Sequence, residues 1–139
     1  MKLGIAQLNL TVGDIAGNAA KLLAAANEAH AAGAVLLLTP EMSICGYPAE
    51  DLVLRTDFTM ACEAALRQLA SDAPPNLALV VGYPERSDDG LFNAAALLRG
   101  GKGLASDKMA ALEAAGVVVS KSPAGLGEAV VEAISRKGK

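Results

Sequence analysis

Short apolar runs alternate with longer stretches of helical periodicity along this chain. Residues 2–9 and 77–81 have the composition of strands, and the continuous apolar run Val35–Leu38 is typical of a strand buried on both faces of a parallel sheet. Between these runs, apolar side chains recur with helical spacing at Ala19, Leu22, Leu23, Ala26 and His30, and again at Phe58, Ala61, Cys62, Ala65, Leu66 and Leu69. Alternation of this kind predicts an α/β fold.

Turn and capping residues complete the predicted order of elements. Asp14 is a candidate N-cap for the first helix and Gly33 a candidate C-terminal glycine, while residues 40–55 form a long loop with a short helical turn. Residues 85–90 read as a hairpin connection into an antiparallel strand at 91–98. Beyond it we expect a helix over 106–115, a strand over 117–119 and a last helix starting at Ser122–Pro123.

The predicted order is therefore β-α-β-α-β-β-α-β-α. We expect a layered, mixed but mostly parallel sheet of about five strands with helices on both faces, and a single domain over residues 1–139.

Composition excludes several classes of protein. The net charge of −3 gives no electrostatic support for a nucleic-acid partner, and no apolar run approaches the roughly 18 residues of a membrane span. Met1 and Lys2 lead directly into a strand-like pattern, so no signal peptide is predicted. The two cysteines have no metal-ligand spacing, and we expect a reduced, cytoplasmic setting without a metal or other cofactor.

Three segments of residues 1–99 carry a family resemblance. KLGIAQLNLTVGDIAGNAAK, LLLTPEMSICGYPAEDLVLR and LVVGYPER followed by LFNAAALL occur in order. They resemble the start of the nitrilase-like glutaminase domain of glutamine-dependent NAD synthetases. The resemblance implies an α/β domain, and it implies that Glu41 corresponds to the family's catalytic glutamate.

Residues 100–139 have a different resemblance. The segment GGKGLASDKMAALEAAGVVVSKSPAGLGEAV is similar to the C-terminal, flavodoxin-like end of the succinyl-CoA ligase alpha subunit. The stretch Asn93–Gly103 is similar to both families, which makes it a natural crossover point. The hypothesis that follows is a recombined or engineered chimera, a folding scaffold without native catalytic function.

Amide hydrolysis of the nitrilase type needs a cysteine nucleophile, a glutamate that transfers protons and a lysine that stabilises negative charge. By resemblance Glu41 supplies the glutamate, whereas the family's lysine and cysteine lie beyond the fourth strand, in the replaced region. Cys62 falls on the apolar face of the second predicted helix, which indicates a structural role in the core. Cys45 lies in the loop, where it is either an unreactive loop residue or a reactive thiol. A residual glutamine amidohydrolase using Glu41 is the alternative to the scaffold.

Two further predictions concern ligands and partners. Gly101, Lys102 and Gly103 precede a predicted helix and could hold an anion or nucleotide weakly, although a plain strand-to-helix turn is the simpler explanation. The phosphorylated histidine of the ligase has no counterpart, because the only histidine, His30, belongs to the first helix. A sheet face left uncovered in such a chain would favour self-association, as a homodimer.

Overall fold

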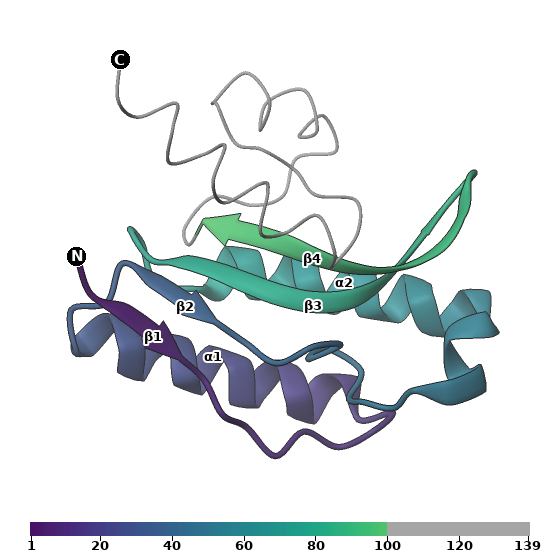
Figure 1. The fold of residues 1–139 in the computed structure, drawn as a ribbon, viewed down its shortest axis with the longest axis horizontal. Helices are drawn as coiled ribbons and strands as arrows, with labels where there is room; N and C mark the ends of the chain where they lie inside the picture. Colours follow the sequence, from purple (N-terminus) through teal and green to yellow (C-terminus); the bar gives the residue numbers. More distant parts are fainter. Residues whose placement is uncertain (100–139) are drawn as a thin grey trace. The chain divides into compact units, whose positions relative to one another are not determined.

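The computed structural model describes residues 1–99 of the 139-residue chain. Its elements are β1 (Leu3–Ile5), α1 (Ile15–Ala31), β2 (Leu36–Leu38), the 3-10 helix η1 (Glu50–Leu54), α2 (Thr56–Asp72), β3 (Ala78–Ser87) and β4 (Gly90–Arg99) (Figure 1). The predicted order is confirmed for this part of the chain, including the short helical turn within residues 40–55. The elements expected after residue 99 lie outside the described residues.

The four described strands form one sheet in the order β1-β2-β3-β4. β1 pairs with β2 and β2 with β3 in parallel, and β3 pairs with β4 as an antiparallel hairpin. This is the mixed, mostly parallel sheet that we predicted, with four strands where we expected about five. The additional strand was predicted at residues 117–119, which the structure does not describe.

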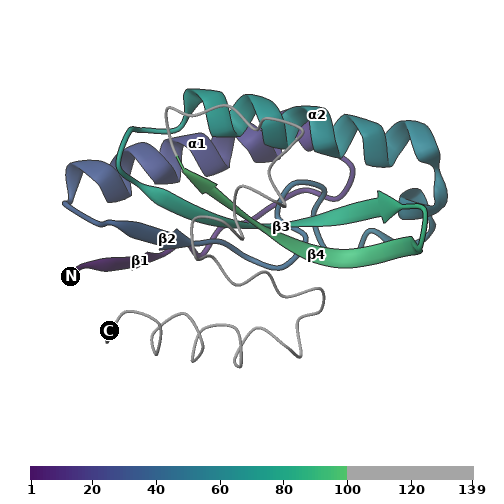
Figure 2. The same ribbon diagram turned by 90° about the horizontal axis from the view of Figure 1, so that it is seen from above.

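The two α-helices, α1 and α2, lie on the same face of the sheet (Figure 2). Their buried side chains include Leu22 and Ala26 of α1 and Leu66 and Leu69 of α2, and the sheet contributes Leu37, Leu79 and Leu98. The core therefore lies between one helical layer and one sheet face. We predicted helices on both faces, and the helices expected over residues 106–115 and from Ser122 onwards fall outside the described residues.

The ends of α1 follow the predicted capping signals. The Asp14 carboxylate accepts a hydrogen bond of 3.0 Å from the backbone N–H of Gly17, and Gly33 adopts a φ of 80° just after the helix. The buried stripe differs from our prediction, because His30 is exposed and Asn18 is buried. The stripe is therefore extended at its N-terminal end by a polar residue.

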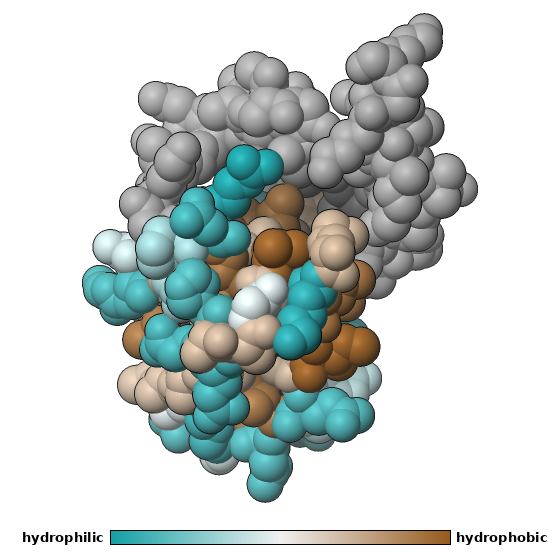
Figure 3. Space-filling view, turned by 90° about the vertical axis from the view of Figure 1, so that its left-hand side faces the viewer, coloured by the Kyte–Doolittle hydropathy of each residue, from teal (hydrophilic) through white to brown (hydrophobic). Residues whose placement is uncertain are grey.

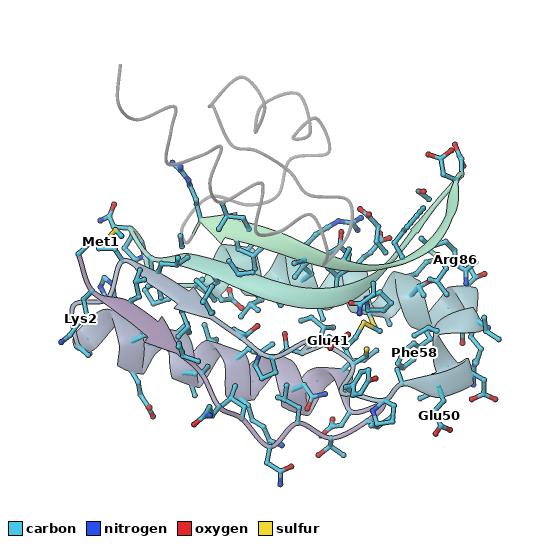
Figure 4. The ribbon with its side chains drawn as sticks, in the orientation of Figure 1. Met1, Lys2, Glu41, Glu50, Phe58 and Arg86 are labelled. Carbon is cyan, nitrogen blue, oxygen red and sulfur yellow. The ribbon has the colours of Figure 1, made fainter. Side chains whose placement is uncertain are left out.

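Arg86 ties the β3–β4 hairpin to the corner between η1 and α2. Its guanidinium donates to the backbone carbonyls of Val53 and Leu54, each at 3.0 Å, and to the hydroxyl of Thr59 at 3.3 Å (Figure 4). These carbonyls end η1 and have no partner inside so short a helix. The hairpin is therefore anchored to the helical layer at the end of the sheet opposite Met1.

The second sheet face carries apolar side chains that no described element covers. Leu3 and Ile5 of β1 alternate with Gly4, which faces Ala29 of α1, so both leucine and isoleucine point away from the helices. Ile5 is 74% exposed, and Leu38 of β2 is aligned with it in the sheet. Figure 3 views the molecule from the left-hand side of Figure 1, and brown apolar residues reach the surface there among hydrophilic ones. Self-association through this face stays a prediction.

Candidate functional site

The loop that follows β2 stays alongside β3 after the β2 strand has ended. The Thr39 N–H and hydroxyl both donate to the Val80 carbonyl, at 3.1 Å and 2.8 Å. Further on, the Ile44 N–H and the Ser43 hydroxyl donate to the Gly82 carbonyl, at 3.2 Å and 3.3 Å. The loop is thus fixed at the carboxyl end of a parallel strand, where α/β proteins place their sites.

Gly82 lets this loop approach β3 closely. A Cβ atom added to Gly82 would lie 2.5 Å from the Met42 nitrogen, 3.0 Å from the Pro40 oxygen and 3.1 Å from the Glu41 carbonyl carbon. All three are backbone atoms, which cannot move aside as a side-chain tip does. Only glycine therefore allows the loop its observed path.

Met42 adopts a strained backbone conformation next to Glu41. Its φ of 50° lies in the left-handed region, which costs a residue with a side chain about 1 kcal/mol or more. The turn that it opens is closed by a hydrogen bond of 2.8 Å from the Gly46 N–H to the Met42 carbonyl. Strained backbone conformations of this kind are concentrated at functional sites. Here the strained turn begins directly after Glu41 and therefore sets the direction of the backbone at that residue.

Asn18 of α1 clamps the loops that follow β1 and β2. Its side chain exchanges two hydrogen bonds with the backbone of Thr11, at 2.8 Å and 2.9 Å, and donates to the Ile44 carbonyl at 3.2 Å. Asn18 is fully buried, and its bond to Ile44 forms in the interior, a medium of low polarity. One helix side chain therefore fixes both loops at the carboxyl edge of the sheet.

Glu41 lies in this loop, beyond the end of β2, as the resemblance implied (Figure 4). The residue is exposed, and the side-chain amide of Asn93 on β4 donates a short hydrogen bond to its Oε1. Among the described residues Oε2 has no hydrogen-bond partner. Within residues 1–99, the carboxylate is thus held at Oε1 alone.

The two cysteines lie in the core. Cys45 and Cys62 are both 0% exposed, and the Cys45 thiol donates to the carbonyls of Met42 and Gly46 at 3.6 Å. A hydrogen bond with Cys45, together with burial, raises the pKa of the Cys62 thiol. The structural role predicted for Cys62 is confirmed, and the burial of Cys45 argues against the alternative of a reactive thiol.

The other predicted ligand residues are not part of this site. Gly101, Lys102 and Gly103 lie outside the described residues, so the anion site stays a prediction. His30 is exposed in the last turn of α1. Within residues 1–99 no three metal-binding side chains come together, and no helix there is long and apolar enough to cross a membrane.

Three residues that shape the site were missed in the sequence. Asn18 carried a usable signal, because it precedes Leu22 and Ala26 at intervals of four, on the buried side of α1. Asn93 interrupts an otherwise apolar strand, and Gly82 lies within another. Each departure from the strand pattern marks a contact with the Glu41 loop.

This arrangement, an α/β sheet with an exposed glutamate after β2, corresponds to a known family. Residues 2–114 match the carbon–nitrogen hydrolase family, and the chain belongs to it. Among curated relatives, the glutamine-dependent NAD(+) synthetase of Synechocystis sp. is 42% identical over 72% of this chain and 19% of that protein. The chain thus spans about a fifth of the length of such relatives.

Solved structures show the same fold. The glutamine-dependent NAD+ synthetase of Acinetobacter baumannii in complex with ADP has a TM-score of 0.67 and 34% identity, over 74% of this chain and 19% of that one. An amidase from Nesterenkonia sp. has a TM-score of 0.61 and 28% identity, over 74% and 40%. A variant of this amidase, with a glutamate changed to glutamine and a cysteine to alanine, is a complex with acrylamide. Another shows covalent addition at the active site cysteine.

These relatives correct our prediction of a scaffold without native catalytic function, which is wrong. The chain belongs to a hydrolase family, and the relatives that it matches are synthetases and amidases. The family match also continues to residue 114, past the crossover that we placed at Asn93–Gly103. The resemblance of residues 100–139 to succinyl-CoA ligase stays a prediction.

Proposed function

We propose that this chain is the glutamate-bearing part of an amide hydrolase that releases ammonia from glutamine. Two comparisons support the substrate class: the 42% identity to a synthetase named as glutamine-dependent, and the shared fold with an amidase. In this reaction Glu41 transfers protons to and from the nucleophile and the leaving nitrogen. The position of Glu41 is the observation that carries the proposal.

The geometry around Glu41 suits proton transfer. A general base needs a free acceptor atom in a fixed place, within hydrogen-bond reach of the proton that it takes. Asn93 fixes one carboxylate oxygen, and the strained turn after Glu41 fixes the backbone. Within residues 1–99, the second oxygen makes no hydrogen bond.

Neither cysteine of this chain is placed to act as the nucleophile. The chain has two cysteines, and both are buried in the core away from solvent. A thiol must be reachable and ionised to attack an amide carbon. The residues described here thus supply the base and its support, and a further segment of the enzyme would supply the thiolate.

A graft tests this assignment. Residues 1–99 would replace the matching segment of the Synechocystis synthetase, and ammonia release from glutamine would be measured. We expect the graft to be active and Glu41→Gln to lower kcat/KM by about 10²–10⁴-fold, the range for a proton-transferring side chain. Glu28→Gln, an exposed glutamate on α1, is the matched control and should leave the rate unchanged.

Two outcomes would contradict the proposal. One is a folded graft that binds glutamine but releases no ammonia. The other is an active graft whose Glu41→Gln variant keeps its rate. The 139-residue chain alone should release no ammonia, because its thiols are buried.

A further inference from the structure

The contact between Asn93 and Glu41 joins two distant parts of the chain. Glu41 belongs to the loop after β2, and Asn93 lies 52 residues later in β4. Among residues 1–99, this is the one hydrogen bond of either side chain. Both residues are exposed, so neither needs the other to satisfy a buried polar group. A contact that core packing does not require calls for another explanation.

Asn93 comes from a rigid part of the fold. β3 and β4 pair over ten residues each, and Asn93 stands opposite Pro84 in this register. Gly82 lies two residues before Pro84, so it shares a sheet face with Asn93. That is the face against which the loop bearing Glu41 is held, as the close approach at Gly82 shows. Pairing with β3 therefore holds the backbone of Asn93, from which the side-chain amide extends, in a fixed position.

The chemistry of the amide suits a base that must give and take a proton. A carboxylate accepts hydrogen bonds, and an asparagine N–H donates one without adding a charge. A lysine or arginine in its place would favour the ionised carboxylate more strongly and oppose proton uptake. A neutral donor thus fixes the direction of the carboxylate and leaves its proton chemistry available.

We propose that Asn93 is a positioning residue for Glu41. It holds Oε1 so that Oε2 is directed at the reacting groups, and it removes rotamer freedom that an exposed glutamate otherwise keeps. This inference rests on the proposed function for its catalytic consequence. The hydrogen bond between Asn93 and Glu41 does not depend on the proposed function, and it can be tested separately.

The first test uses the full 139-residue chain. The side-chain amide signals of Asn93 would be recorded by NMR from pH 7 down to about pH 3, where carboxylates take up protons. We expect these signals to move during the titration in the wild-type chain and to stay still in Glu41→Ala. Signals that are identical in the two proteins would overturn the contact and the inference with it.

The second test measures catalysis in the graft described above. Asn93→Ala should lower kcat about tenfold and change KM by less than about twofold, because a lost orientation acts on the chemical step. Asn93→Asp has the same size but places a second carboxylate beside Glu41, so its kcat should fall below that of Asn93→Ala. The same two changes at Asn27, exposed on α1, are the controls.

The outcomes separate the inference from the proposed function. An active graft that loses its rate in Glu41→Gln but keeps it in Asn93→Ala would overturn the positioning role alone. Equal kcat values for Asn93→Asp and Asn93→Ala would also overturn the positioning role. A side chain that only supports the strand would give the same kcat in both variants, whereas one that contacts Glu41 would give a lower kcat with aspartate. A folded but inactive graft would overturn the proposed function, and the NMR titration would still decide the contact.

Discussion

Gly82→Ala is the change that most directly tests how the Glu41 loop is held. The added Cβ would lie 2.5 Å from the Met42 nitrogen, about 0.9 Å closer than the 3.4 Å at which ordinary contact begins. Because the nearest atoms belong to the backbone, the whole loop must retreat from β3 by about that distance. The 3.2 Å hydrogen bond from Ile44 to the Gly82 carbonyl would then exceed hydrogen-bonding distance.

The cost of this displacement follows from its parts. Overpacking a closely packed site costs about 1–3 kcal/mol, and each lost hydrogen bond adds about 1 kcal/mol. We therefore expect Gly82→Ala to lower the free energy of unfolding by about 2–4 kcal/mol. Since Glu41 moves with the loop, the graft carrying this change should also lose ammonia release.

Urea unfolding followed by circular dichroism measures the effect. With a slope of about 2 kcal/mol per molar urea, the midpoint should fall by about 1–2 M. Gly4→Ala is the matched control, because its Cβ would meet the mobile tip of Leu37 at 2.9 Å and its next neighbour at 3.6 Å. It should cost less than about 1 kcal/mol. Equal effects of the two changes would refute the explanation by backbone contact.

Three further predictions follow from the fold. Asn18→Ala leaves the Ile44 carbonyl without a partner in the core and removes two part-buried bonds to the Thr11 backbone, and should lower the free energy of unfolding by about 2–4 kcal/mol in the same urea assay. Partial burial and the neighbouring Glu85 carboxylate raise the pKa of the Tyr83 phenol above its ordinary value of 10.0, so the unfolded chain loses a proton that the native one keeps. The contribution of this group to stability should therefore be constant below pH 10 and fall above it, by at most about 1 kcal/mol per pH unit, and Tyr83→Phe should reduce this slope in urea unfolding. The 139-residue chain should self-associate through the sheet face that no element within residues 1–99 covers, and a strict monomer in light scattering at high concentration would contradict this.

The order of the elements could be predicted because it depends on local patterns. Apolar spacing and capping residues placed both helices and the hairpin within a few residues of their observed bounds. The first strand was predicted over residues 2–9, yet β1 pairs only at Leu3–Ile5. Its partner β2 is only three residues long, and Asn18 draws the Thr11 backbone toward α1 instead. The length of a strand depends on its partner, which local sequence does not specify.

The site could be predicted only where a family pattern marked it. Glu41 was identified from its flanking residues, and it lies where expected. The residues that support it were missed, because Asn93 and Gly82 act across distances of about 40–50 residues in sequence. Neither type of residue is chemically conspicuous on a strand. Tertiary contacts of this kind become visible only when the strand register is known.

Cys45 tests whether nearness to Glu41 in the sequence has any catalytic meaning. To reach a substrate its thiol would have to leave the turn, breaking the backbone bonds from Cys45 and Gly46 to Met42 and those of Ile44 to Gly82 and Asn18. At about 1 kcal/mol each, opening costs about 4 kcal/mol, so roughly one molecule in a thousand would be open. An attack by Cys45 would therefore be about a thousandfold slower than one by an exposed thiolate of equal reactivity. In the active graft, Cys45→Ser should accordingly leave ammonia release within about twofold of wild type, whereas a loss comparable with that of Glu41→Gln would show that Cys45 is the nucleophile after all.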